Sequence, residues 1–225
     1  MATETKIAGA GSSVNRGTDT AWISPGLVTA SDSYDALCTT TATGDNTQHL
    51  RASSFGFGLP SGSQITGITV VYRRKAQYSS SAVEVEVKIV DGGTQLGSNK
   101  ASADTWGQSY ELRTVGGSAD TWGITGGDLT TLSDNANSTI GVEIQAESNI
   151  FSPCDFNIDY VEMTLEYTAG AAGVYNGTTI AKGASAFWLL LCDASRVASD
   201  KLWTPERPLW TPRPAYSLTR ETSQG

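Results

Sequence analysis

The sequence contains few of the residues on which most catalytic and metal centres depend. Its 225 residues include one histidine, His49, and three cysteines, Cys38, Cys154 and Cys192, without a CxxC spacing. A Ser-His-Asp triad would have to use His49, which lies in a polar stretch, and no GxSxG, GxxxxGK or HExxH motif is present. We therefore interpret His49 as a surface residue and the cysteines as buried free thiols. The sequence predicts no catalytic residue, no cofactor and no enzyme activity.

Two groups of acidic residues offer other chemistry. Paired carboxylates such as Glu84 and Glu86 would suit a glycosidase, but they alternate along an expected strand and are interpreted as a solvated face. The stretch 155–159 has oxygen ligands at alternate positions, as a calcium loop does, but it lacks the glycine and the distal glutamate of an EF-hand. We predict no metal site, with calcium kept as an alternative.

Charged residues and long apolar runs are also scarce. Charged residues make up 17% of the chain, and the net charge is −10 over residues 1–168 and +2 over residues 169–225. An acidic body repels a phosphate backbone, so we expect no nucleic-acid partner. The longest apolar run, 186–192, is too short to span a bilayer. Residues 1–10 lack the basic start and apolar centre of a signal peptide, so we expect neither a membrane nor a secretory route.

What the sequence does contain is glycine, serine and threonine, with short runs in which apolar and polar residues alternate. The clearest run, VEVEVKIV at 83–90, places Val83, Val85, Val87 and Ile89 toward a core and the charged residues between them toward solvent. Turn signals separate it from comparable runs at 55–59, 65–75, 140–146 and 161–167.

These patterns predict an all-β fold, an antiparallel two-sheet β-sandwich of jelly-roll type. We expect the sandwich over residues 21–168. An extended N-terminal arm is expected over 1–20, and a linker with a Pro/Trp-rich C-terminal arm over 169–225. The stretch 128–137 is expected to hold one helical turn at most.

The hexapeptide SADTWG occurs twice, at 102–107 and at 118–123. In each copy the aspartate can accept backbone N–H groups at a corner, the tryptophan can cap an end of the sandwich, and the glycine lets the chain turn beside the ring. We interpret both copies as structural corners. The alternative is that Trp106 or Trp122 is exposed and stacks on a glycan, and Tyr34 and Tyr78 are further candidates for such a surface.

The C-terminal arm combines bulky apolar residues with prolines. Residues 187–192 are FWLLLC, and LWTPERPLWTPRP follows at 202–214. The prolines forbid a helix and favour an extended chain, which cannot bury its own side chains. We expect this arm to lie on a neighbouring subunit, with its own sandwich as the alternative. The predicted intersubunit anchor consists of Phe187, Trp188, Leu189, Trp203, Pro205, Leu209, Trp210 and Pro212.

Several stretches of the body resemble a known module. They are Trp22 followed by Pro25, FGFGLPSGSQITGITVV at 55–71, GGSADTWG at 116–123, IGVEIQAE at 140–147, and a strand that begins at Asp159. Over residues 20–168 this order resembles the β-sandwich module of tailed-bacteriophage virion structural proteins, of the capsid-decoration or tail-appendage type. The resemblance implies a virion component and supplies no catalytic residue.

We therefore predict a bacteriophage virion structural protein, an accessory subunit that is attached to the particle through its terminal arms. It would be a capsid decoration (cement) protein or a small tail-appendage or adaptor subunit, made in the host cytoplasm and located in the virion. Its expected partners are other virion proteins, such as major capsid or tail and neck subunits, and copies of itself in a homo-oligomer. The alternative is a carbohydrate- or receptor-binding module of a tail fibre or head fibre, used in host attachment. A hydrolase of host polysaccharide is the third hypothesis, and the sequence supports it least.

Overall fold

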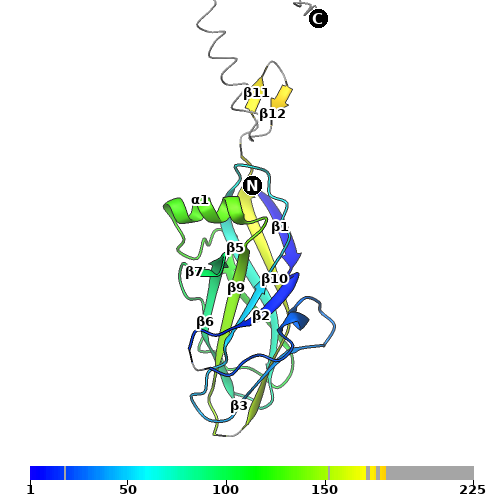
Figure 1. Cartoon of the computed structure of the whole chain (residues 1–225), viewed down its shortest axis with the longest axis vertical. Helices are drawn as coiled ribbons and strands as arrows, with labels where there is room; N and C mark the ends of the chain where they lie inside the picture. The colour runs from blue at the N-terminus through cyan, green and yellow to red at the C-terminus, as the bar shows by residue number, and fades with distance from the viewer. Residues whose placement is uncertain (18, 152, 171–172, 176–177, 181–225) are drawn as a thin grey trace, which may run out of the picture. The chain divides into compact units, whose positions relative to one another are not determined.

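The computed structural model describes residues 1–17, 19–151, 153–170, 173–175 and 178–180. Strands dominate it, and the predicted all-β sandwich is confirmed (Figure 1). Two short helical elements are present in these ranges, the 3₁₀ helix η1 (Pro25–Val28) and the helix α1 (Gly126–Asn135). Within the expected linker, β11 (Gly173–Tyr175) and β12 (Thr178–Ile180) pair as a small antiparallel hairpin.

Two five-stranded antiparallel sheets form the sandwich. Sheet 1 has the strand order β1 (Ala2–Ile7), β10 (Cys154–Thr168), β5 (Gln64–Ala76) and β8 (Glu111–Gly117), and β3 (Ala36–Thr40) pairs with the first part of β10. Sheet 2 has the strand order β2 (Ala10–Val14), β4 (His49–Ser53), β9 (Ile140–Ser148), β6 (Ala82–Asp91) and β7 (Thr94–Leu96).

The core lies between the two sheets and follows the predicted alternation over most of its strands. Val161, Met163 and Leu165 are fully buried on β10, as are Val142 and Ile144 on β9. Burial of an aliphatic side chain of this size contributes about 1.5–3 kcal/mol before the entropy of ordering is counted. The largest fully buried side chains of this core are Trp106, Trp122, Tyr72 and Phe156.

The N-terminal residues are part of the sandwich, so the prediction of an extended arm over 1–20 was wrong. Residues 2–7 pair with β10 from Tyr167 to Glu162, and residues 10–14 pair with β4, so this segment adds one edge strand to each sheet. Ala8, at the crossing between the sheets, is buried, and its N–H donates to Val161 O at 2.9 Å. The segment is polar because an edge strand with few core contacts needs little apolar surface.

Strand β6 departs from strict alternation, and the prediction for residues 83–86 was wrong. The pairing of β6 with β9 shifts between Glu84 and Glu86, which marks a β-bulge at Val85. The bulge turns Glu84 into the interior, whereas Glu86 remains on the outer face. The two carboxylates therefore lie on opposite sides of the strand and cannot flank one bond as a glycosidase pair does.

Helix α1 has ten residues, where at most one turn was expected. Its sequence has weak helix propensity, but Leu132 and the C-cap residue Ala136 are fully buried, and Leu129 packs against the same core. Ser133 Oγ also accepts the N–H of Ile65 at 3.0 Å. Packing against the sandwich therefore outweighs the intrinsic propensity, as it commonly does in short helices.

Candidate functional site

The two SADTWG tryptophans are both fully buried. Trp122 Nε1 donates to Ile68 O at 2.9 Å, and Asp120 Oδ1 accepts the Trp122 N–H at 2.7 Å, as predicted for a corner. Trp106 packs on Phe156 with 5.9 Å between the ring centroids. Neither tryptophan ring can reach a ligand, so the alternative of glycan stacking on Trp106 or Trp122 was wrong. Tyr34 and Tyr78, the further candidates for a glycan-binding surface, are both exposed.

The predicted anchor residues of the C-terminal arm lie outside the described residues, and their role stays a prediction. The stretch 155–159 belongs to β10, where Asp155 Oδ1 accepts the Thr39 hydroxyl at 2.6 Å. Across the part of the chain that the structure describes, no three His, Cys, Asp or Glu side chains gather as a metal site, and no helix is long and apolar enough to cross a bilayer.

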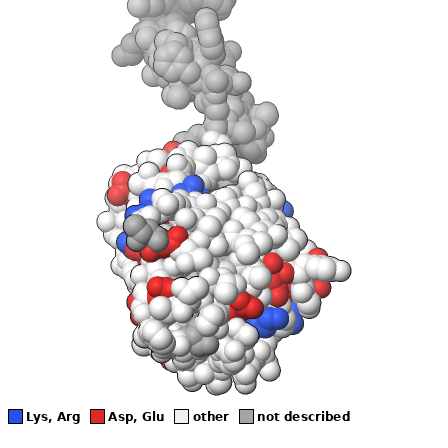
Figure 2. Space-filling model, turned by 60° about the horizontal axis from the view of Figure 1, so that its bottom comes forward, with Lys and Arg blue, Asp and Glu red and all other residues white. Residues whose placement is uncertain are grey.

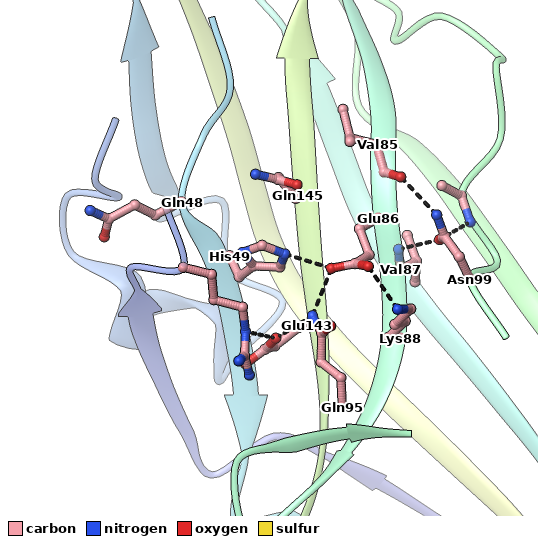
Figure 3. A network of polar contacts seen from close by, with 12 residues as sticks. Gln48, His49, Val85, Glu86, Val87, Lys88, Gln95, Asn99, Glu143 and Gln145 are labelled. Atoms are coloured by element: carbon pink, nitrogen blue, oxygen red, sulfur yellow. Dashed lines mark hydrogen bonds and ion pairs between the residues drawn. The ribbon is translucent and has the colours of Figure 1, made fainter. Parts of the chain in front are cut away.

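His49 is buried on the outer side of sheet 2, so its interpretation as a surface residue was wrong. It begins β4, and its Nε2 lies 2.7 Å from Glu86 Oε2 (Figure 3). His49 Nδ1 is buried without a partner among the described residues, so we assign the proton to Nε2. Gln95 Nε2 links this pair to a second carboxylate, at 2.7 Å from Glu86 and 2.8 Å from Glu143.

Glu143 is the centre of the same network and is fully buried. Arg51 donates to its Oε1 from Nε at 2.9 Å and from Nη2 at 2.6 Å. Arg16 donates to both oxygens, at 2.9 and 3.0 Å, and also to Gly93 O at 2.8 Å. These bonds tie the segment after β2 to the β6–β7 turn across the outer face of sheet 2. Both oxygens of the Glu143 carboxylate have hydrogen-bond partners within the protein, which indicates a structural role.

The hydrogen bonds of this network set the pKa of Glu86. Burial alone would raise that pKa, but hydrogen bonds from Lys88, Gln95 and His49 outweigh burial and lower it from 4.5 to about 2. The pKa of Glu143 is lowered as well, because Arg16 and Arg51 outweigh the effect of its burial. Both carboxylates are therefore ionised throughout the neutral range.

Because the folded-state pKa of Glu86 lies below its unfolded value, the ionised form stabilises the fold. This contribution is complete above pH 4.5 and is lost as the pH falls toward about 2. We expect Glu86→Gln to flatten the decline in the free energy of unfolding between these pH values, measured by urea denaturation. Asp104→Asn, at an exposed position, is the control, and an equal flattening in that variant would contradict the assignment.

The outer side of sheet 1 carries a different cluster, in which aromatic residues accompany the charges. We define the tyrosine face as Tyr34, Asp35, Arg73, Lys75, Tyr110, Asn157 and Tyr160. Arg73 and Lys75 are alternate residues of β5, and the pairing places Lys75 beside Asn157 of β10. Tyr110 precedes β8, on the opposite side of β5 from β10. Four segments that are distant in the sequence thus meet on one face.

Contacts between these side chains fix the centre of the tyrosine face. The Tyr110 ring centroid lies 4.0 Å from Arg73 Cζ and 4.1 Å from Lys75 Nζ, within the range of cation–π contacts. The Tyr110 hydroxyl donates to Asp35, on the far side of β5, so the side chain reaches across that strand. Asn157 Nδ2 also donates to Asp35, at 3.2 Å.

Each cation of the tyrosine face has a carboxylate partner. Arg73 Nη1 donates to Asp159 Oδ2 at 2.8 Å, and Lys75 Nζ lies 3.5 Å from Asp35 Oδ2. Burial, together with Asp35, raises the pKa of Tyr110, so its hydroxyl keeps its proton at neutral pH. The cluster is therefore close to neutral and presents both donors and acceptors. On the face drawn in Figure 2, charges of both signs likewise lie in small groups among uncharged residues, without a basic stripe.

The exposed aromatic residue of the tyrosine face is Tyr34, which is 68% exposed. Its position is set by the loop before β3, where the Tyr34 N–H donates to Asp32 Oδ1 at 3.0 Å and the Ser33 N–H donates to the buried Asp159 at 2.9 Å. Asp159 therefore holds both this loop and Arg73. The sequence analysis named Tyr34 as a candidate for a binding surface. It could not predict the cluster of Asp35, Arg73 and Tyr110, because these contacts join segments that are distant in the sequence.

No protein-family model matches this sequence, and no curated protein matches it significantly. Solved structures with a similar strand arrangement include that of CBM4, at 10% identity and a TM-score of 0.37 over 72% of this chain and 94% of that one. CBM29_1, a family 29 carbohydrate-binding module from Piromyces equi, is 8% identical with a TM-score of 0.36, over 73% of this chain and 91% of that one. The family 11 carbohydrate-binding module of a cellulosomal cellulase of Clostridium thermocellum is 10% identical with a TM-score of 0.35, over 77% and 92%.

These likenesses are too low to carry an argument about function. Nothing in them points to a bacteriophage virion protein, so the resemblance seen in the sequence is supported only as far as the β-sandwich fold.

Proposed function

We propose that this protein is a non-catalytic carbohydrate-binding module and that the tyrosine face is its binding surface. The observation that carries the proposal is the exposed Tyr34, which directly precedes Asp35 of a neutral cluster of fixed donors and acceptors. A tyrosine ring offers an apolar surface and a polar edge, which suits the mixed surface of a sugar. A carbohydrate-binding module was the alternative function predicted from the sequence. The proposed binding surface is now the tyrosine face of sheet 1, because the two tryptophans are buried.

The charges of the tyrosine face fit a hydroxyl-bearing ligand. Asp159 is the one hydrogen-bond partner of the Arg73 side chain among the described residues, so further N–H groups of its guanidinium are available to a ligand. Asn157 adds a donor, because its amide has a second N–H besides the one that Asp35 accepts. These side chains are held by one another before any ligand arrives, which reduces the entropy lost on binding.

The test is Tyr34→Ala, because the side chain is exposed and its removal leaves the core intact. We expect the variant to lose glycan affinity by about tenfold or more, as an aromatic hot spot does, with an unchanged melting temperature. Binding is measured on an array of soluble plant, bacterial and animal glycans. Phe151→Ala removes an aromatic side chain that is 89% exposed outside this face and is the control. Equal binding by both variants and the unchanged protein would contradict the proposal.

A second proposal keeps the role of an accessory virion subunit, because sheet 1 also exposes apolar side chains. Leu112 is 63% exposed on β8, and Ile7 is 41% exposed on β1. These residues belong to β8 and β1, two edge strands of sheet 1, and an edge strand favours pairing with another protein chain, in agreement with the expected homo-oligomer. Light scattering of the full chain would test the oligomer, and a monomer at micromolar concentration would contradict that part of the proposal.

A further inference from the structure

The polar side chains of the tyrosine face continue along β5 beyond the cluster itself. Arg73 and Lys75 are followed at the end of the strand by Gln77, the next residue in the same alternation. Gln77 is exposed, and its backbone N–H donates to Asp155 O at 2.8 Å. The side chain of Gln108 lies beside it, because Gln108 Nε2 donates to Gln77 O at 3.1 Å.

This arrangement gives three successive levels of polar side chains on the outer side of sheet 1. Arg73 with Asp159 forms the first level, Lys75 with Asp35 and Asn157 the second, and Gln77 with Gln108 the third. Among the described residues, Gln77 Nε2 and Gln108 Oε1 have no hydrogen-bond partner, so the third level offers one free donor and one free acceptor. Gln77 lies four positions beyond Arg73 along the extended chain, a span of about 13 Å.

We infer that the ligand is an uncharged, linear oligosaccharide that runs along β5 from Tyr34 toward Gln77 and Gln108. This inference depends on the proposed function and specifies its ligand class. A single sugar cannot contact all three levels, because their span exceeds one ring. An acidic sugar gains little, since Arg73 and Lys75 are already paired with carboxylates. The amides of Gln77 and Gln108 are uncharged and suit hydroxyl groups.

The experiment uses the full chain and an array that carries neutral, uronic and sulfated glycans of one to six sugar units, followed by calorimetry with the glycans that bind. The variant combines Gln77→Ala with Gln108→Ala, and Gln108→Ala alone serves as the milder version. Gln64→Ala is the matched control, because Gln64 is an exposed glutamine at the opposite end of the same strand.

We expect affinity to rise from one to at least three units, with neutral glycans bound best. The double variant should lose affinity for chains of three or more units by about fivefold to thirtyfold, as the loss of one or two neutral hydrogen bonds implies. Binding of shorter glycans should be unchanged, and Gln64→Ala should behave as the unchanged protein.

Affinity that is independent of chain length, an equal loss for short and long glycans, or a preference for acidic glycans would overturn the inference and leave the proposed function standing. If no glycan of any length binds the unchanged protein, the proposed function fails as well. A loss for Tyr34→Ala without any effect of the glutamine variants would place the ligand at the Tyr34 end alone, which also overturns the inference.

Discussion

Glu84→Ala is expected to destabilise the fold by about 3–5 kcal/mol, since breaking a buried ion pair leaves an uncompensated charge. The Glu84 side chain is fully buried and accepts hydrogen bonds from Tyr72, Arg74 and the backbone N–H of Ser102, the last at 2.9 Å. Arg74 is itself buried, and its remaining carboxylate partner, Glu111, is partly exposed. Removing Glu84 would leave the buried Arg74 with Glu111 as its one carboxylate partner among the described residues, and would leave the Tyr72 hydroxyl and the Ser102 N–H without their acceptor.

The measurement is urea denaturation at neutral pH, monitored by tryptophan fluorescence, with the free energy of unfolding taken from the midpoint and slope. Glu86→Ala is the control on the same strand, because Glu86 lies on the partly exposed outer face and should lose less stability. Replacing the cluster by apolar residues, with Glu84→Leu and Arg74→Met together, should restore most of the loss. A cost below about 1 kcal/mol for Glu84→Ala would contradict the ionic role assigned to it.

The sequence predicted the sandwich because period-two alternation is a local property. The runs at 140–146 and 161–167 each identify a strand from neighbouring residues, and their apolar side chains do face the core. The bulge at Val85 could not be read in this way, because residues 83–89 (VEVEVKI) alternate perfectly in the sequence. The register is instead set by β9, more than fifty residues further along the chain.

The candidate site was less predictable for the same reason. His49 belongs to a polar stretch, but it is covered on sheet 2 by a network that includes Arg16, Gln95 and Glu143. The tyrosine face likewise depends on Asp35 meeting Tyr110 across β5. Such contacts join residues that no short window contains. Of the residues of the tyrosine face, the sequence alone identified only Tyr34 as a candidate for a binding surface.

The second large effect is expected for Trp122→Ala, with a loss of about 3–5 kcal/mol in the free energy of unfolding. Trp122 fills the corner formed by the second SADTWG copy and is fully buried. Nearby backbone is packed tightly around it, since a Cβ atom at Gly116 would lie 2.5 Å from Trp122 Nε1 and 2.1 Å from Ile68 O. Removal of a ring that is packed this closely leaves a cavity that the surrounding chain fills only in part.

The two SADTWG copies supply their own control. Trp106→Ala should cost a similar amount, because that ring is equally buried, but the phenylalanine variants should differ. Trp122→Phe loses the hydrogen bond to Ile68 O and should cost about 1–3 kcal/mol more than the volume change alone. Trp106→Phe loses no such bond, because Trp106 Nε1 has no partner among the described residues. Equal costs for the two phenylalanine variants would contradict this difference between the corners and would show that the hydrogen bond to Ile68 O adds nothing measurable to stability.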